Sequence, residues 1–171
     1  MTVAESSLAQ FQTDIDKWMA ENVPKNPGFL LPLTFLEVGT EQQLDFLRDW
    51  QHKLWQAGFL GMHWPTEYGG QGADPAYQGL VDKALTAHNA PIIFNTIGLN
   101  WTGPLLLDVG TEDDRKRYIK NILTGDDIWC QGFSEPDHGS DLGNVQTRAV
   151  RDGDEYVVNG SKVWTTLGNY A

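Results

Sequence analysis

Residues 129–142 have the sequence WCQGFSEPDHGSDL, and the hydrophobic pattern of the chain changes there. Before this stretch apolar residues recur at helical spacing, whereas from Ile128 onward they recur at every second residue, as in β-strands. We expect the stretch to begin as a strand and to continue as a loop rich in Gly, Pro, Ser and Asp. Loops at such a change of architecture are common ligand sites. Gly139 lets the backbone come close to a phosphate, because it has no side chain and tolerates positive φ.

The composition disfavours several classes of protein. The 171 residues carry a net charge of -11, from 12 basic and 23 acidic side chains, which argues against binding to nucleic acid or to an anionic membrane surface. No apolar stretch is long enough to span a bilayer, and residues 1–6 lack the basic start of a signal peptide. The single cysteine, Cys130, excludes an internal disulfide framework and a thiolate zinc cluster, and we expect it to be buried and inert in an apolar strand. These features favour a cytoplasmic protein.

The first 126 residues predict an all-helical domain. Apolar stripes at helical spacing occur in residues 6–21, between Thr40 and Gly58, from Asp74 onward, and between Thr111 and Gly125. Residues 92–107 are apolar nearly all round, which is typical of a buried central helix. The linker of residues 24–39 is rich in Leu and Phe, so we expect it to lie against the body of the domain, with room for a short helical turn.

Residues 127–171 predict the first strands of an antiparallel β domain. Strands are expected at residues 128–134, 144–150, 155–159 and 161–166. Asp152-Gly153 and Asn159-Gly160 are dipeptides typical of hairpin turns. These few short strands leave an open edge, so we expect the chain to be the N-terminal part of something longer. The predicted fold is mainly α, with a helical domain at residues 1–126 and an incomplete β domain at residues 127–171.

Two groups of polar residues in the β domain are suited to binding a ligand. Ser134, Ser140 and the amides around Gly139 offer hydrogen-bond donors for a pyrophosphate or for a heterocycle rich in carbonyls and ring nitrogens. Trp164 lies beside two threonine hydroxyls, which suits a stacked flat ring. From the residues alone, a solvated turn and a core Trp are the commoner outcome of such patterns.

The sequence gives little support to other chemistries. Asp137, His138 and Asp141 do not have the spacing of a strong metal signature, so we expect a surface loop with a solvated His. The serines lack the surroundings of a nucleophile elbow, which disfavours a serine hydrolase. The other three histidines are scattered and are expected to be structural or exposed; they are His52, His63 and His88.

The chain resembles the acyl-CoA dehydrogenase family in residues 129–142, in TRA at residues 147–149 and in GDEYVVNGSKVWTT at residues 153–166. WPTEYGG at residues 64–70 and GTE at residues 110–112 are similar to the helical domain of the same family. The likeness covers nearly the whole chain, and the motifs occur in order. It implies a truncated form of the family's fold, which has an N-terminal helical domain, a middle β domain and a C-terminal four-helix domain.

The resemblance also implies an FAD site in the β part of the chain. Gln131 and Phe133 would lie along the isoalloxazine. Ser134 would hydrogen-bond the pyrimidine edge of the flavin through its hydroxyl and amide. Gly139 and Ser140 would approach the FAD diphosphate, and Ser140 would also reach the pantetheine arm of an acyl-CoA substrate.

The same resemblance implies that Trp164 packs on the flavin ring, with Thr165 beside it and Thr166 near N5. The implied reaction is α,β-dehydrogenation of an acyl-CoA thioester, as in fatty-acid β-oxidation: a carboxylate removes the α proton and the β hydride passes to N5. Electrons would leave to an electron-transferring flavoprotein, and the enzyme would be a homodimer or homotetramer. The family's catalytic Glu lies in its C-terminal domain, so no catalytic residue is assigned here and the fragment alone is expected to be inactive.

The chain departs from the family at Asp137-His138, where Gly-Ala is frequent. The substitution adds bulk and charge to the loop that CoA would approach. Three alternatives stay open: a non-catalytic flavin-binding subunit of a heteromeric dehydrogenase, an oxygen-using acyl-CoA oxidase or flavin monooxygenase, and a flavin-free scaffold.

Overall fold

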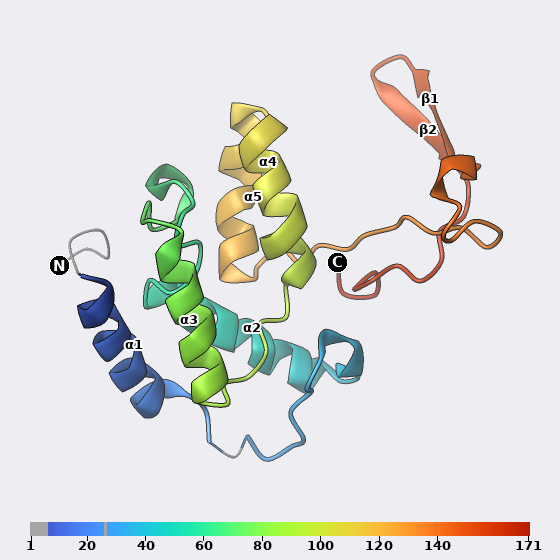
Figure 1. Cartoon of the computed structure of the whole chain (residues 1–171). Helices are drawn as coiled ribbons and strands as arrows, with labels where there is room; N and C mark the ends of the chain where they lie inside the picture. Colours follow the sequence, from blue (N-terminus) through green and yellow to red (C-terminus); the bar gives the residue numbers. More distant parts are fainter. Residues whose placement is uncertain (1–6, 26) are drawn as a thin grey trace. The chain divides into compact units, whose positions relative to one another are not determined.

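The computed structural model describes residues 7–25 and 27–171 of the protein. The chain divides into two compact units, Met1–Ile128 and Trp129–Ala171. The first unit is helical, and the second contains a two-stranded antiparallel hairpin (Figure 1). The mainly α fold with antiparallel strands that follow the helices is therefore confirmed. No helix in the described residues is long and apolar enough to cross a membrane.

The helical unit is built from five α-helices, of which α1, α2 and α5 are capped by polar side chains. The helices are α1 (Leu8–Asn22), α2 (Glu41–Gln56), α3 (Ala76–Ala87), α4 (Gly103–Val109) and α5 (Glu112–Thr124). Helix α1 packs on α3, and α5 packs on both α2 and α4. The hydroxyls of Ser7, Thr40 and Thr111 accept hydrogen bonds from amides in the first turns of α1, α2 and α5. These caps satisfy backbone donors that a helix start leaves unpaired, which is why the predicted helices begin where they do.

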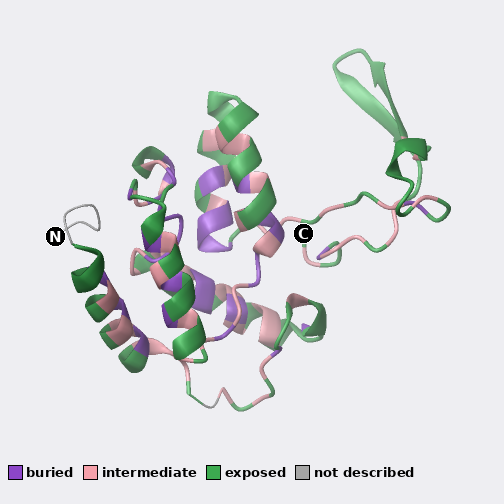
Figure 2. Ribbon diagram, viewed as in Figure 1, coloured by how far each residue is buried: buried purple, intermediate pink, exposed green. Residues whose placement is uncertain are grey.

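The core of the helical unit is formed by the apolar faces that the sequence pattern predicts, as the buried stripes in Figure 2 show. Trp50 of α2 stacks on Trp18 of α1 with ring centroids 5.9 Å apart, and its Nε1 donates to the carbonyl of Pro91. The other fully buried side chains include Ile15, Met19, Leu47, Leu54, Phe94, Ile119, Ile122 and Leu123. Burial of each such side chain contributes about 1.5–3 kcal/mol.

A buried polar network closes the end of α5. Gln51 Nε2 donates to the carbonyls of Ile122 and Leu123 at 2.9 and 3.1 Å, and Gln51 Oε1 accepts from the Asn95 amide at 3.3 Å. Asn95 Nδ2 donates to the carbonyls of Ile122 and Asp127. These carbonyls lie at or just beyond the helix end, where no further turn can pair them. Side chains from α2 and from the loop before α4 therefore fix the path by which the chain leaves α5.

Residues 92–107 do not form a buried central helix, so that prediction is wrong. A π-helical turn, η4 (Gly98–Thr102), precedes the short α4. Pro104 explains the wide turn, because it has no N–H for the helical ladder and its ring would clash with the carbonyl four residues earlier. Trp101, Leu105 and Val109 are each more than half exposed and follow one another at four-residue intervals.

The apolar linker does not lie against the body along its whole length, and that prediction is also wrong in part. Leu30 is 87% exposed, and Leu33 and Leu36 are exposed as well. Polar contacts hold the segment instead: Gln43 Nε2 donates to the Leu30 carbonyl, and Glu37 accepts from the Leu33 amide. The expected short helical turn is confirmed as the 3₁₀ helix η2 (Phe35–Glu37).

The second unit contains the strands β1 (Arg148–Asp152) and β2 (Glu155–Asn159), paired antiparallel from Arg148 opposite Asn159 to Asp152 opposite Glu155. Residues 153 and 154 form the two-residue loop, and Gly153 has φ +63°, the conformation that this kind of turn demands. The strand at residues 155–159 is thus confirmed, and the predicted hairpin turn forms one residue later than expected, at Gly153-Asp154 instead of Asp152-Gly153. Every residue of both strands is exposed.

Two of the other strand predictions are wrong, and the third is confirmed only from Arg148 onward. Residues 128–134 and 161–166 are not strands, and only an isolated bridge pairs Gln131 with Thr166. Trp164 has φ +55°, a left-handed backbone that breaks the pleat of the second segment. The strand expected at residues 144–150 begins only at Arg148, because the 3₁₀ helix η5 (Leu142–Asn144) occupies the preceding residues.

Asn159-Gly160 does not make a hairpin turn, since β2 ends there without a partner strand that follows. Gly160 is needed for a different reason. A Cβ added to it would lie 2.1 Å from Thr147 Oγ1 and 2.7 Å from Thr147 Cα. The glycine therefore allows two backbone segments to approach closely, as glycines in extended segments often do.

Candidate functional site

Two segments of the second unit run antiparallel and bring together residues that the sequence predicts for a binding site. The Gln131 amide donates to the Thr166 carbonyl at 3.4 Å, and the Val163 amide donates to the Ser134 carbonyl at 2.9 Å. These two bonds set one register for residues 131–134 and 163–166. Gln131, Ser134 and Thr166 therefore share one short ribbon, although 28 residues separate its halves in the sequence.

Aromatic side chains are exposed on this ribbon. Trp164 is 91% exposed and Phe133 is 54% exposed, and the register places them opposite each other. The expectation of a core Trp is wrong for Trp164, because its left-handed backbone conformation turns the residue out of a regular strand. For a residue with a Cβ this conformation costs about 1–2 kcal/mol. A large apolar face in water together with a strained backbone is more often a feature of a ligand site than of a packed core.

The loop with Gly139 and Ser140 follows a tight turn. The Glu135 amide donates to the His138 carbonyl at 2.9 Å, and the His138 amide donates back to the Glu135 carbonyl at 3.1 Å. Gly139 and Ser140 come next and are exposed, and a Cβ on Gly139 would meet no atom within 4 Å. Among the residues that the structure describes, Gly139 is not one of the glycines with positive φ. Its backbone is therefore open to a ligand from outside without being strained.

Glu135 is a residue of this site that the sequence analysis missed. Its side chain is only 6% exposed and accepts three hydrogen bonds. The donors are the amides of Gln146 and Thr147, at 2.6 and 2.8 Å, and Lys162 Nζ at 2.9 Å. Hydrogen bonds from Thr147, from the Gln146 amide and from Lys162 lower the pKa of Glu135 from 4.5 to about 2. The side chain is thus a buried carboxylate at any pH near neutrality.

The sequence analysis also missed Lys162, because the sequence does not show which residue the ammonium group of Lys162 contacts. Besides Glu135, its Nζ donates to the Phe133 carbonyl at 2.9 Å. The available signal was its position as the only charged residue in the predicted strand 161–166. A charge in a short strand requires a partner once the strand is partly buried.

The remaining chemical candidates of this unit do not assemble into a site. Cys130 is exposed, which contradicts the prediction of a buried thiol, because the apolar strand expected around it is not formed. Within residues 7–25 and 27–171 no three His, Cys, Asp or Glu side chains lie close enough to hold a metal ion. Asp137 is exposed and His138 is half-buried in the turn after Glu135.

Two motifs of the helical unit meet through one hydrogen bond. Tyr68 lies in the WPTEYGG motif and donates from its hydroxyl to Glu112 Oε2 of the GTE motif at 2.6 Å. The bond from Tyr68, followed by that from Lys116, lowers the pKa of Glu112. The bond to Glu112 and the burial of the ring raise the pKa of Tyr68. The contact links the loop after α2 to the first turn of α5.

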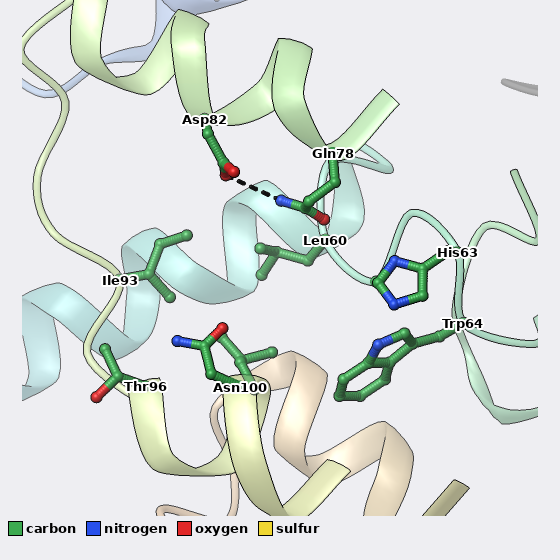
Figure 3. Close-up of a pocket in the computed structure, with 10 residues that line it drawn as sticks. Leu60, His63, Trp64, Gln78, Asp82, Ile93, Thr96 and Asn100 are labelled. Atoms are coloured by element: carbon green, nitrogen blue, oxygen red, sulfur yellow. Dashed lines mark hydrogen bonds between the residues drawn. The ribbon is translucent and has the colours of Figure 1, made fainter. Parts of the chain in front are cut away.

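The helical unit also contains a cavity of about 330 Å³, shown in Figure 3. Its lining residues are Leu60, Gly61, His63, Trp64, Gln78, Asp82, Ile93, Thr96, Leu99 and Asn100. Gln78 Nε2 donates to Asp82 Oδ1 at 3.0 Å on its α3 side, and His63 is exposed at its rim. None of the site residues predicted from the sequence lines this cavity.

Comparison with protein families covers almost the whole chain. The family described as acyl-CoA dehydrogenase, N-terminal domain, matches residues 33–126, and acyl-CoA dehydrogenase, middle domain, matches residues 130–171. Acyl-CoA dehydrogenase IpdE1 of Mycolicibacterium smegmatis is 35% identical over 175 residues, which cover 96% of this chain and 44% of the relative. Acyl-CoA dehydrogenase FadE26 of Mycobacterium tuberculosis is 43% identical over 114 residues, or 67% of this chain and 28% of the relative. The chain thus spans less than half the length of these curated relatives.

Solved structures give the same result. The Tcur3481-Tcur3483 steroid ACAD superposes with a TM-score of 0.72 and 34% identity, over 96% of this chain and 41% of that chain. A chain of the ChsE4-ChsE5 complex from Mycobacterium tuberculosis superposes with a TM-score of 0.73 and 28% identity, over 100% of this chain and 42% of that chain.

Proposed function

This chain belongs to the acyl-CoA dehydrogenase family, and from that premise we propose that it is the flavin-binding N-terminal part of an FAD-dependent acyl-CoA dehydrogenase. The observation that carries the proposal is the ribbon formed by residues 131–134 and 163–166. It gathers the residues that the family resemblance assigns to the flavin from two distant parts of the sequence.

The residues present fit a flavin. The exposed indole of Trp164 offers a flat apolar face of the kind that stacks on an aromatic heterocycle. Ser134 and Thr166 carry hydroxyls on the same ribbon, and a hydroxyl can both donate to and accept from the carbonyls and ring nitrogens of an isoalloxazine. The open backbone at Gly139 and the hydroxyl of Ser140 suit a diphosphate.

In this proposal the residues of the chain bind and orient, and they do not carry out the proton transfer. When bound, FAD supplies a hydride acceptor for the β-carbon of the acyl-CoA. Gln131, Phe133 and Trp164 would hold the ring system, with Thr165 beside the indole. Ser134 and Thr166 would direct hydrogen-bond donors to its polar edge, where fixed dipoles stabilise developing charge. Ser140 would also contact the pantetheine arm of the substrate.

The proposed reaction is α,β-dehydrogenation of an acyl-CoA thioester. It requires a base for the α proton, and we assign no glutamate of this chain to that role. The best-placed carboxylate of the second unit, Glu135, already accepts three hydrogen bonds and has a pKa of about 2, which makes it a poor base. The base would lie in a part of the longer protein outside this chain. An electron-transferring flavoprotein is the proposed electron acceptor, in the cytoplasm.

An anaerobic titration of the full-length protein tests this function. The protein would be purified with its flavin and titrated with acyl-CoAs of different chain length and shape while the flavin absorption band is followed. We expect one class of acyl-CoA to bleach the band, and slow reoxidation in air would separate a dehydrogenase from an oxidase. A protein that retains no FAD, even after FAD is added, would refute the proposal.

A second candidate function is that of a flavin-binding subunit in a heteromeric acyl-CoA dehydrogenase, in place of a homodimer or homotetramer. It is favoured by two structural neighbours that each pair two proteins, ChsE4-ChsE5 and Tcur3481-Tcur3483. The latter is a steroid ACAD, so acyl-CoAs with a steroid ring system belong in the substrate panel. Under this function the purified full-length protein would bind FAD but bleach only after its partner subunit is added.

A further inference from the structure

The carboxylate of Glu135 lies where three segments of the second unit meet. Its own backbone continues the segment 131–134, which is paired with residues 163–166. Its side chain accepts from the amides of Gln146 and Thr147, at the far end of the loop that carries Gly139 and Ser140. It also accepts from Lys162, the residue directly before the segment 163–166. One buried side chain thus joins all the segments that carry the proposed flavin residues.

Lys162 completes the same junction from the other side. Its Nζ donates to Glu135 Oε1 and to the Phe133 carbonyl, both at 2.9 Å. The lysine therefore holds the backbone at Phe133. The next residue, Ser134, is held by a second bond, from the Val163 amide to its carbonyl. The main-chain turn from Glu135 to His138 then fixes the position of the backbone at Gly139, the next residue.

We infer that Glu135 and Lys162 are positioning residues for the flavin: the ion pair between the buried carboxylate and the half-buried lysine holds the ribbon 131–134/163–166 and the Gly139–Ser140 loop in one arrangement. This inference rests on the proposed function and adds two residues to its site. Neither side chain is required to touch the flavin, and both act through the backbone segments that they join.

The hydrogen-bond pattern explains why a carboxylate is needed at residue 135. Oε1 accepts from the Thr147 amide and from Lys162, while Oε2 accepts from the Gln146 amide. The donors to Glu135 are two backbone amides and an ammonium, and none of these three can accept a hydrogen bond. A glutamine would turn its NH₂ toward one of these donors, and a buried donor without an acceptor is costly. Glu135→Gln therefore removes the junction with almost no change in volume.

The test measures FAD binding to the full-length protein. Apoprotein would be titrated with FAD for the wild type, for Glu135→Gln and for the matched control Glu155→Gln, which makes the same change at an exposed residue of β2. We expect Glu135→Gln to weaken FAD binding by about tenfold or more, a change that one or two lost buried hydrogen bonds can produce. The control should stay within about twofold of the wild type.

A spectroscopic readout separates positioning from simple stability. At saturating FAD we expect the Glu135→Gln protein to show brighter flavin fluorescence and a shifted visible band, because Trp164 and the polar ribbon no longer meet the ring as in the wild type. A lower melting temperature with an unchanged spectrum of the bound flavin would assign Glu135 a purely structural role and overturn the inference. Unchanged FAD affinity and spectrum would overturn it as well.

If the Glu135→Gln protein does not fold, variants at Lys162 provide a second test. Lys162→Met keeps both amide bonds to Glu135 but removes the ammonium, and it should weaken FAD binding. Lys162→Arg keeps the charge and several donors, so it should restore most of the affinity. Equal affinity in Lys162→Met and wild type would refute the inference while leaving the proposed function intact. A wild-type protein that binds no FAD would refute the proposed function itself, together with the role inferred here.

Discussion

The hydroxyl of Tyr68 donates a 2.6 Å hydrogen bond to Glu112 Oε2, so two short motifs of the helical unit depend on each other. The bond lowers the pKa of Glu112 below its ordinary value of 4.5 and raises the pKa of Tyr68 above 10.0. A carboxyl group with a lowered folded-state pKa stabilises the fold above its unfolded pKa, and this contribution disappears as the pH falls through the folded pKa. The protonated phenol of Tyr68 also stabilises the fold. This contribution is lost only at high pH, as the pH rises through the raised folded pKa of Tyr68.

Tyr68→Phe should therefore reduce the stability of the helical unit at pH 7 and flatten its loss of stability in acid. The wild type should lose more unfolding free energy between pH 7 and pH values below 4.5 than the variant does, because only the wild type has this hydrogen bond to lose. Urea unfolding at several pH values measures both effects. Tyr156→Phe, at an exposed tyrosine of β2, is the control, and parallel pH curves for Tyr68→Phe and wild type would contradict the assignment.

Gln51→Leu should destabilise the helical unit by about 2–4 kcal/mol. The leucine fits the volume but removes the donor to the Leu123 carbonyl and the acceptor of the Asn95 amide in a buried site, while the Ile122 carbonyl keeps its bond from Asn95 Nδ2. Each buried polar group that loses a hydrogen bond costs about 1–3 kcal/mol. Equilibrium urea unfolding measures the loss. Gln42→Leu, at an exposed position of α2, should change stability by less than about 0.5 kcal/mol. Equal stability of the two variants would show that the network contributes little.

Trp164→Ala should weaken FAD binding to the full-length protein by about tenfold, since a stacked aromatic pair contributes roughly 0.5–1.5 kcal/mol beyond the area that it buries. The melting temperature of the apoprotein should not fall, because the indole is 91% exposed and packs little in the free chain. Tyr156→Ala removes another exposed aromatic ring from the same unit and should leave FAD affinity unchanged. Full FAD occupancy in Trp164→Ala at limiting FAD would remove this residue from the site.

Gly139→Ala should leave folding unaffected and weaken FAD binding. The added Cβ meets no atom within 4 Å and the backbone there needs no positive φ, so the fold itself tolerates alanine. A diphosphate that approaches the backbone at this point would meet the new methyl group. Gly143→Ala, which is equally open in the structure, is the control. Isothermal titration with FAD and thermal melting of both variants decide whether residue 139 faces the cofactor.

The sequence predicts the starts of α2 and α5 well because each of them carries a local signal. Ser7, Thr40 and Thr111 accept the amide bonds expected of capping residues, and the apolar stripes behind them are buried. The segment 92–107 is different, since its burial depends on partners that hydrophobicity alone does not identify. Pro104 is the local signal against a regular helix in this segment, because a proline inside an apolar run interrupts the helical hydrogen bonds.

The ribbon could be predicted only in part. An alternating pattern indicates extended backbone at residues 161–166, but it cannot reveal the left-handed turn at Trp164, which depends on how the chain crosses residues 131–134. The family resemblance supplied candidate flavin residues, whereas Glu135 and Lys162 became visible only as a pair. The two residues are 27 positions apart, so their contact is a tertiary one. A tertiary contact of this kind cannot be predicted from the periodicity of the sequence.

In the part of the chain that the structure describes, the hairpin of β1 and β2 is a sheet of two strands with an edge on either side. Both faces are exposed and include Val150, Val157 and Val158, and each strand has an outer edge with unpaired backbone groups. Such an edge is a template onto which a further strand can add, and valines favour that addition. The charges of Arg148 and Arg151 oppose it on β1, while β2 carries only the charge of Glu155. A further strand that paired with this sheet would therefore meet less charge on β2 than on β1, and Val158→Lys would oppose its addition there.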